Sequence, residues 1–220
     1  MRLLLLGSTA ALALTAQAAA QTPGLAIHGA GLPGGIHVGA TAGLSGSSSW
    51  PGEAFALGAS LGFSSGRIGV VGTVGRIDFD ADPFESSLTV GVRGVLRLFG
   101  GGLDIPLQVD AFAGYGRFDE PDERCLSCPI PWSARGAYHV PAGLGLTLNL
   151  STPVFSIRPW LAPRVELFTG LSGDVGVTET DWAASAGVDL RFLGGLGLTV
   201  AWDKIEHVDQ IIGFGVTYRF

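Results

Sequence analysis

IIGFGVTYRF, residues 211–220, is the stretch of sequence that decides the fold. Large apolar residues occupy every second position, and glycine, threonine and arginine occupy most of the positions between them. Strict alternation with a period of two is typical of a β-strand with one apolar and one polar face. In a soluble protein the apolar face packs on a core, whereas in a membrane barrel it faces lipid and the polar face lines the lumen. The rest of the sequence distinguishes these two structures.

The composition is apolar without containing a membrane-spanning helix after the amino-terminal region. Mean hydropathy is +0.41, yet beyond residue 20 no apolar run reaches the roughly 18 residues that a spanning helix requires. An alternating pattern accounts for both facts, because half of every strand is apolar. The formal net charge is −6, and the 13 basic residues form no polybasic cluster. Nucleic acid is therefore not an expected partner.

The amino terminus has the features of a secretory signal peptide. Arg2 supplies a positive charge, an apolar segment follows over residues 3–14, and alanines 18–20 match the preference for small residues at a cleavage site. A membrane-anchor helix is the alternative, but the apolar segment is short for one. We therefore predict three parts: a signal peptide over residues 1–20, a lead-in segment over 21–33, and one β-domain over 34–220.

Alternation of the same kind recurs throughout the β-domain. Pro159 and Pro163 fall within the seventh apolar segment, and proline removes a hydrogen bond from a paired strand. The third segment alternates less cleanly than the others, so eight strands is the alternative to ten. Connections after odd-numbered segments are mostly longer than those after even-numbered ones, as in outer-membrane barrels. The expected strands cover residues 34–44, 54–63, 67–78, 87–99, 105–118, 138–150, 155–168, 184–192, 196–202 and 211–220.

Three features favour a membrane barrel over a soluble sandwich. The apolar face is nearly unbroken in every predicted strand, and the opposite face is rich in glycine, threonine, serine and alanine. In hydrocarbon every backbone polar group must be bonded, and strands satisfy this only in a closed barrel. Aromatic residues near strand ends fit the interfacial girdles of such barrels. The predicted fold is all-β, a transmembrane antiparallel up-and-down β-barrel; the aromatic residues are Phe63, Phe99, Tyr115, Tyr138, Trp202, Tyr218 and Phe220.

The last residues carry a resemblance to a known family. Gly215, Tyr218 and Phe220 resemble the terminal assembly signal of bacterial outer-membrane β-barrels, and the ending is similar to that of small OmpA-like barrels. The resemblance implies a bacterial outer-membrane location, contact with outer-membrane lipid, and recognition of these three residues by the barrel-assembly machinery. We expect a monomer. Barrels of this family most often have eight strands, so ten is a departure.

Charged residues on the polar faces of the strands predict an ionic lumen. An interior of about eight to ten strands is barely wider than its own side chains, and a charge there must be paired or hydrated. We expect ion pairs that fill the lumen. A small anion-preferring pore is the alternative, because arginines outnumber acids. The predicted lumen network is Arg93, Arg97, Asp110, Arg158, Arg164, Glu166, Asp189, Arg191 and Arg219.

Two further groups of residues are candidate sites. Cys125 and Cys128 are expected to form a disulfide in an oxidising compartment; a metal site would need two more ligands, which are not nearby in sequence. The predicted strand boundaries put Asp203, His207 and Asp209 in one outer loop, where an acid–histidine pair could activate water. They match no catalytic motif that we recognise, so a rim-site hydrolase is the third function considered.

The sequence therefore predicts a non-enzymatic outer-membrane barrel without metal or cofactor. Its expected role is structural or adhesive, through acidic outer loops that connect the strands. These loops contain Asp80, Asp82, Glu85, Asp119, Glu120, Asp122 and Glu123.

Overall fold

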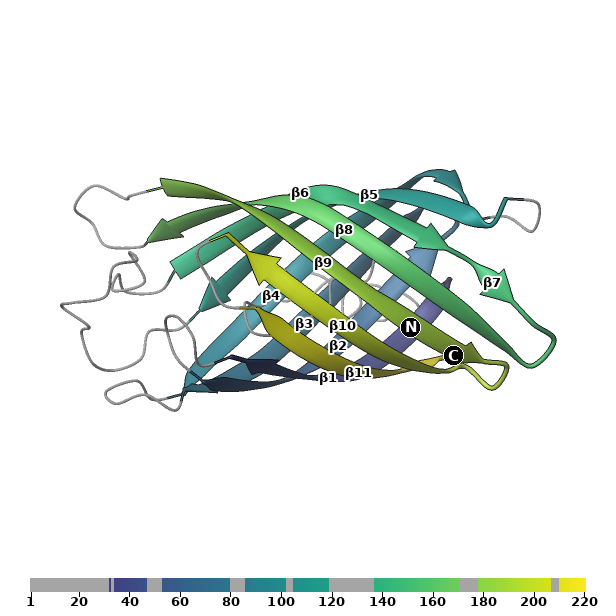
Figure 1. The fold of residues 1–220 in the computed structure, drawn as a ribbon, viewed down its shortest axis with the longest axis horizontal. Helices are drawn as coiled ribbons and strands as arrows, with labels where there is room; N and C mark the ends of the chain where they lie inside the picture. Colours follow the sequence, from purple (N-terminus) through teal and green to yellow (C-terminus); the bar gives the residue numbers. More distant parts are fainter. Residues whose placement is uncertain are drawn as a thin grey trace, which may run out of the picture.

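The computed structural model describes residue 32 and residues 34–46, 53–79, 86–101, 105–118, 137–170, 178–206 and 210–220. The part of the chain so described consists of strands and their connections, and none of its residues belongs to a helix long and apolar enough to cross a membrane (Figure 1). The strands are β1 (Gly35–Ser45), β2 (Ala54–Ser65), β3 (Ile68–Phe79), β4 (Ser87–Gly100), β5 (Leu107–Phe118), β6 (Ala137–Leu148), β7 (Leu150–Ser151), β8 (Phe155–Gly170), β9 (Thr178–Phe192), β10 (Leu196–Ile205) and β11 (Ile211–Arg219).

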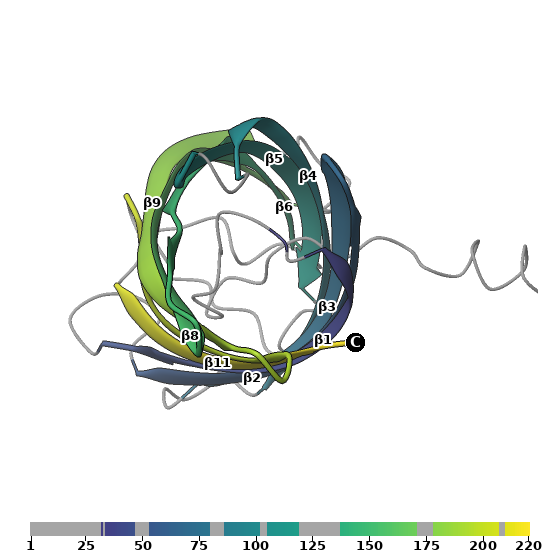
Figure 2. The same ribbon diagram turned by 90° about the vertical axis from the view of Figure 1, so that its right-hand side faces the viewer.

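The strands close into one antiparallel barrel. Each long strand pairs with its neighbours in sequence, β1 pairs with β11, and a β6–β8 pairing closes the ring (Figure 2). The two-residue β7 continues the line of β6 beyond Asn149 and pairs with β8. The barrel therefore has ten wall strands, which confirms the predicted fold class and strand count; the eight-strand alternative is wrong.

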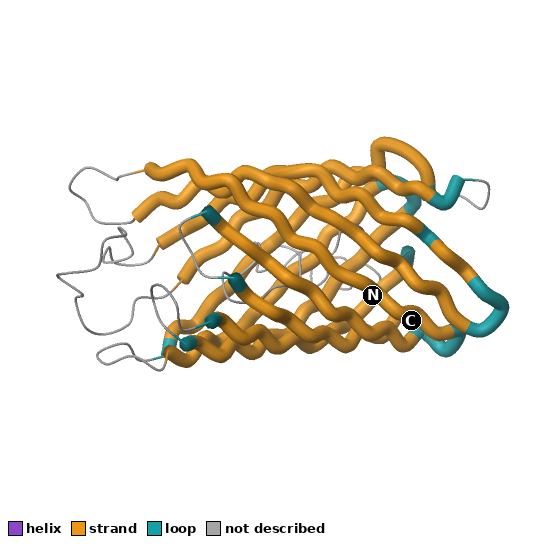
Figure 3. Tube along the Cα trace, in the orientation of Figure 1, coloured by secondary structure: helices purple, strands orange, loops and turns teal. Residues whose placement is uncertain are grey.

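The two ends of the barrel differ in their connections. Strands β1, β3, β5, β8 and β10 end at one rim of the barrel, which we call the long-loop end. The turns after β2, β4, β7 and β9 lie at the other, the short-turn end, together with the start of β1 and the end of β11 (Figure 3). At the turn after β4, Gly100 and Gly101 have φ of 71° and 77°, a region that glycine adopts at no steric cost.

The outward-facing side chains form an apolar band around the barrel. Exposed fractions of 61% for Leu61, 67% for Ile68 and 49% for Phe214 are typical of this surface. On the described strands, charged residues at outward positions occur only toward the long-loop end, where Arg76 and Asp78 form an exposed ion pair at 2.8 Å. A ring of exposed apolar side chains without charges is the surface that contacts hydrocarbon in an outer-membrane barrel.

Aromatic side chains mark both edges of this apolar band. At the short-turn end, Tyr218 and Phe220 point outward with ring centroids 5.1 Å apart in an edge-to-face arrangement. Toward the long-loop end, Tyr115 and Tyr138 meet on adjacent strands with centroids 5.6 Å apart. Two such girdles match the two interfaces of a bilayer. Further exposed aromatic residues near the short-turn end are Phe63, Phe99, Phe155 and Phe192, and near the long-loop end Phe55, Trp182 and Trp202.

The seventh expected strand is present despite its prolines. β8 pairs with β9 without interruption from Phe155 to Thr169. On its other edge, β8 pairs with β6 and then with β7, and this pairing has two gaps. The first gap lies between Arg164 and Leu161, and the second lies between Trp160 and Ile157, where β7 replaces β6 as the partner. The two gaps contain Pro163 and Pro159, so the missing proline donors interrupt one edge of the strand while the other holds it in the wall.

Two predicted strand boundaries were wrong. β9 begins at Thr178 rather than at residue 184, and β10 extends to Ile205 rather than to residue 202. The predicted loop around Thr178–Asp181 is therefore strand, because β8 extends far enough to pair with it, with Glu166 opposite Asp181. Asp203 consequently lies within the wall and not in an outer loop.

Candidate functional site: the polar lumen

The inward faces of the strands divide the lumen into three levels, and β8 contributes to all of them. Arg164 and Glu166 lie nearest the long-loop end, Trp160 and Ala162 lie midway, and Arg158 lies nearest the short turns. We call the three levels the outer ion cluster (His139, Arg164, Glu166, Ser185 and Asp203), the apolar layer (Leu32, Val71, Val95, Phe112, Trp160, Ala162 and Ala201) and the inner cavity, which is lined by His37, Arg97, Arg158, Arg191 and Arg219 among others.

The outer ion cluster is centred on the Arg164 guanidinium. Its Nε lies 2.6 Å from Glu166 Oε1, and its two terminal nitrogens donate to the Asp203 carboxylate at 2.8 and 3.0 Å. The three side chains are between 0% and 3% exposed. One arginine therefore binds two carboxylates at once, using the planar fork that suits carboxylate geometry.

Serine and histidine complete this cluster. Ser185 Oγ accepts a hydrogen bond from Arg164 Nη1 at 2.6 Å and donates one to Asp203 Oδ1. His139 Nδ1 lies 3.0 Å from Glu166 Oε2, where a protonated ring nitrogen donates to the carboxylate. The His139 ring stacks on Phe168, with centroids 6.0 Å apart. The cluster joins β6, β8, β9 and β10, and its members are almost inaccessible to solvent.

The apolar layer is a cluster of buried side chains in the middle of the lumen. Phe112 and Trp160 are 4% and 5% exposed, and Arg93 lies over the Phe112 ring with its guanidinium carbon 5.8 Å from the centroid. Gly187 leaves room for the indole, because a Cβ at that position would lie 2.5 Å from Trp160 Cζ2. Leu32, which precedes β1 in the chain, is buried in the same layer. Bulky apolar side chains thus occupy a face that the sequence analysis expected to be small and polar.

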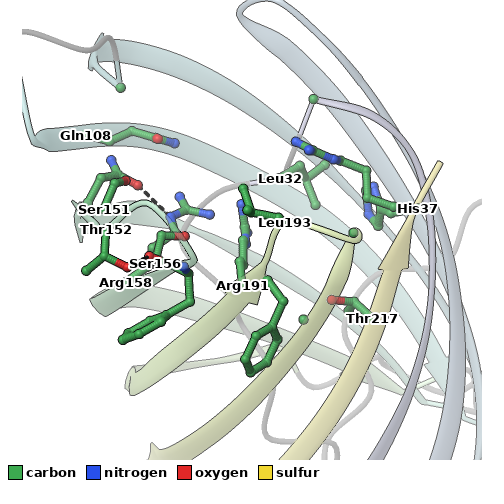
Figure 4. A pocket seen from close by; sticks show the side chains of 18 of the residues that line it. Leu32, His37, Gln108, Ser151, Thr152, Ser156, Arg158, Arg191, Leu193 and Thr217 are labelled. Carbon is green, nitrogen blue, oxygen red and sulfur yellow. Dashed lines mark hydrogen bonds between the residues drawn. The ribbon is translucent and has the colours of Figure 1, made fainter.

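The inner cavity opens at the short-turn end and has a volume of about 510 Å³. Four arginines line it, and they come from four different strands: Arg97 from β4, Arg158 from β8, Arg191 from β9 and Arg219 from β11. His37 from β1 also lines the cavity (Figure 4). Strands far apart in the sequence therefore bring cationic side chains to one hollow.

Two aspartates lie next to the cavity but are already engaged. Asp110 accepts a hydrogen bond from Gln108 Nε2 at 2.6 Å, and its other oxygen lies 3.8 Å from Arg97 Nε. Asp189 accepts hydrogen bonds from Trp160 Nε1 and Thr199 Oγ1, both at 3.0 Å. Its second oxygen lies 3.5 Å from Arg191 Nη2. The two arginine–aspartate distances, 3.8 and 3.5 Å, are longer than those of charge-assisted hydrogen bonds.

Arg158 keeps spare donor capacity beside the cavity. Its Nε donates to Asn149 Oδ1 at 2.6 Å (Figure 4). Its Nη1 is buried and has no hydrogen-bond partner among the described residues, and the same holds for Nδ1 of His37. Buried polar atoms normally have a partner, so both groups are suited to bind something that enters the cavity.

The nine residues predicted as one lumen network lie at inward positions, and their contacts fall at three levels of the lumen. Arg164 and Glu166 belong to the outer ion cluster, and Arg93 contacts the apolar layer. The remaining six lie in or beside the inner cavity: Arg97, Asp110, Arg158, Asp189, Arg191 and Arg219.

Sequence reasoning missed three members of the outer ion cluster. His139 and Ser185 do not belong to the predicted lumen network, and Asp203 was predicted to lie in an outer loop. Period-two alternation along β10 puts Asp203 on the same inward face as Thr199 and Ala201, so this signal is present in the sequence. The partnership between these residues has no signal in the sequence, because it joins four strands.

Other predicted sites fall partly outside the described residues. Cys125, Cys128, His207, Asp209 and the acidic loop residues predicted as a working surface all lie outside them. Among the described residues, no three His, Cys, Asp or Glu side chains are arranged to hold a metal ion. Within the assembly signal, Gly215 faces inward and is buried, whereas Tyr218 and Phe220 point outward and are 44% and 75% exposed.

Comparisons with known proteins give only distant structural similarities. No family model matches the chain, and no curated protein matches it in sequence. The N-terminal β-barrel domain of Pseudomonas aeruginosa OprF is 10% identical over 84% of this chain and 96% of its own, with a TM-score of 0.36. The β domain of the Bordetella autotransporter BrkA is 13% identical over 85% and 99%, with a TM-score of 0.47. Neisserial surface protein A is 13% identical over 84% and 97%, with a TM-score of 0.40.

The fold itself is established by the barrel's own geometry. Closure through the β1–β11 and β6–β8 pairings leaves no open edge, and the outer surface is apolar between two aromatic girdles. These are the defining features of an outer-membrane-type β-barrel. The resemblance noted from the sequence is therefore confirmed at the level of fold.

Proposed function

We propose that this protein is a non-enzymatic outer-membrane barrel whose lumen is closed to ions. The observation that supports this most directly is the burial of two layers of side chains at different levels of the lumen. The outer ion cluster has side chains that are at most 3% exposed, and the apolar layer contains Phe112 and Trp160, at 4% and 5%. A permeating ion would have to displace both.

The physical cost of opening either level supports the same conclusion. Separating Arg164 from its two carboxylates in a poorly hydrated interior leaves unpaired charges, which costs about 3–5 kcal/mol for a buried pair. The apolar layer offers a permeating anion no polar ligand of its own apart from the neighbouring Arg93. In a barrel of this size the side chains fill the interior.

An anion-preferring pore remains the second candidate, because four arginines line the inner cavity. A cationic ring attracts anions into a pore. The cavity, however, is bounded toward the middle of the barrel by the apolar layer, to which Trp160 and Leu32 belong. The arrangement favours a cationic recess that is closed at its inner end over a continuous path.

A catalytic role has little support in the described residues. Asp203, the acid of the considered rim site, is 2% exposed and is bonded to Arg164 and Ser185. We therefore propose a structural or adhesive role, with the acidic residues of the outer connections as the surface that partners would meet. We also propose a monomer that contacts outer-membrane lipid and is recognised during assembly through Gly215, Tyr218 and Phe220. The exposure of both aromatic rings at the end of β11 supports this recognition.

Conductance in planar lipid bilayers tests the closed lumen. Refolded protein, shown to be a barrel by a mobility difference between boiled and unboiled samples on a gel, should give no defined single-channel openings. Regular openings with reversal potentials selective for anions would overturn the proposal in favour of the pore. Openings in only the boiled sample would indicate a contaminant, so that sample is the control.

A further inference from the structure

We propose that the inner cavity is a binding site for a phosphate group, as the free dianion or as a phosphomonoester. The proposal rests on three properties of the cavity: its charge, its unpartnered donors and its access from the short-turn end. None of them depends on whether the lumen conducts.

The charge of the cavity favours a dianion. Four arginines line the cavity. Asp110 lies 3.8 Å from Arg97, and Asp189 lies 3.5 Å from Arg191. Four positive charges minus two negative charges leave a surplus of two. Low-dielectric walls strengthen the attraction between such a surplus and a ligand relative to bulk water.

Two unpartnered side-chain nitrogens beside the cavity give the ligand a place to bind: Arg158 Nη1, which is a donor, and His37 Nδ1, which donates in the tautomer that carries its proton. Arg158 is 5% exposed and His37 is 4% exposed, and both line the cavity. Arg158 Nη1 and His37 Nδ1 have no hydrogen-bond partner among the described residues. A guanidinium whose Nε is already fixed by Asn149 is held in one orientation, so it loses little conformational freedom when an oxyanion binds.

Phosphate fits these donors better than carboxylate does. Guanidinium groups bind phosphate oxygens through paired N–H donors, and a tetrahedral ligand can engage arginines that approach from several walls. Here they approach from β4, β8, β9 and β11. A cavity of about 510 Å³ falls in the range of small-molecule sites, about 300–1,000 Å³. An organic group attached to the phosphate would also fit.

A ligand can enter the cavity from the short-turn end. The lining includes turn residues such as Gly101, Thr152 and Gly195, and the side chains of Arg97 and Arg191 are both 27% exposed. In outer-membrane barrels this end faces the periplasm. The phosphate could therefore come from a soluble compound or from a lipid headgroup, and the experiment distinguishes the two.

Isothermal titration calorimetry with inorganic phosphate tests the site. Refolded full-length protein in octyl glucoside, a detergent without phosphate, is titrated in low-chloride buffer, and we expect one saturable site. Arg158→Gln should weaken binding at least tenfold, because it removes the charge and the fixed fork. The matched control is Arg76→Gln, which removes an arginine from the outer surface near the long-loop end and should leave the affinity unchanged.

The outcomes separate the proposal from its rivals. A gel of boiled and unboiled samples establishes that each variant is folded, and Arg191→Gln gives a second test if Arg158→Gln does not fold. No saturable binding to folded wild-type protein, or equal losses in Arg158→Gln and Arg76→Gln, would overturn the proposal. Competition by dihexanoyl phosphatidic acid at lower concentration than phosphate would identify a lipid headgroup as the ligand, and weaker competition would identify a soluble one.

Discussion

The outer ion cluster and the inner cavity both contain inward arginines, but they differ in how fully those arginines are paired. β8 contributes an inward arginine to each, Arg164 and Arg158, six residues apart on one face. Arg164 has two carboxylates and a serine around it, whereas Arg158 has one amide oxygen at its Nε and a terminal nitrogen without a partner among the described residues. A charge sealed from water must be fully paired. A charge beside a cavity can keep donors for water or a ligand.

Removing the paired arginine tests this difference with the largest expected effect. Arg164→Ala leaves Glu166 and Asp203 buried without their counter-charge, so we expect the free energy of unfolding to fall by about 3–5 kcal/mol. Unfolding by urea in lipid vesicles, followed by tryptophan fluorescence, measures it. Arg158→Ala is the matched comparison and should cost clearly less. Equal losses would mean that the two levels do not differ in pairing.

The sequence was sufficient to predict the wall of the barrel but not the contents of its lumen. Alternation with a period of two depends on one strand at a time, so the outward residues from Ile212 to Phe220 and the count of ten strands were predictable. The contact between Arg164 and Asp203 spans 39 residues of sequence and depends on the stagger of strands around the ring. Charge alone gave no way to assign an arginine to the sealed cluster or to the open cavity.

The apolar layer was missed for a related reason. Phe112 and Trp160 lie on inward faces whose other residues are mostly small or polar, and no pattern within either strand indicates an apolar layer. Only closure of the barrel brings them together with Val71 and Val95. A bulky residue on a lumen face is thus a sign of a filled level, particularly where a glycine such as Gly187 leaves room for it on the next strand.

A substitution in the apolar layer tests which of the two levels closes the lumen. Phe112→Ala should lower the free energy of unfolding by about 3 kcal/mol, because it removes a buried aromatic ring and leaves a cavity. Planar-bilayer recordings should still show no openings, since the outer ion cluster is untouched. Openings in Phe112→Ala alone would show that the apolar layer is the barrier and that the ion cluster is permeable.

The smallest expected effect comes from the pair at the edge of the inner cavity. Arg191 Nη2 lies 3.5 Å from Asp189 Oδ2, and its side chain is 27% exposed, so it is partly hydrated. Arg191→Gln should cost about 1 kcal/mol or less. Raising NaCl from 0.1 to 1 M shortens the Debye length from about 10 to about 3 Å. The higher salt concentration should therefore reduce the loss of stability in Arg191→Gln further. It should leave the loss in Arg164→Ala nearly unchanged, because ions do not reach a side chain that is 0% exposed. Urea unfolding of both variants at the two salt concentrations measures this. Equal salt dependence in the two would contradict the distinction between a sealed level and an open one.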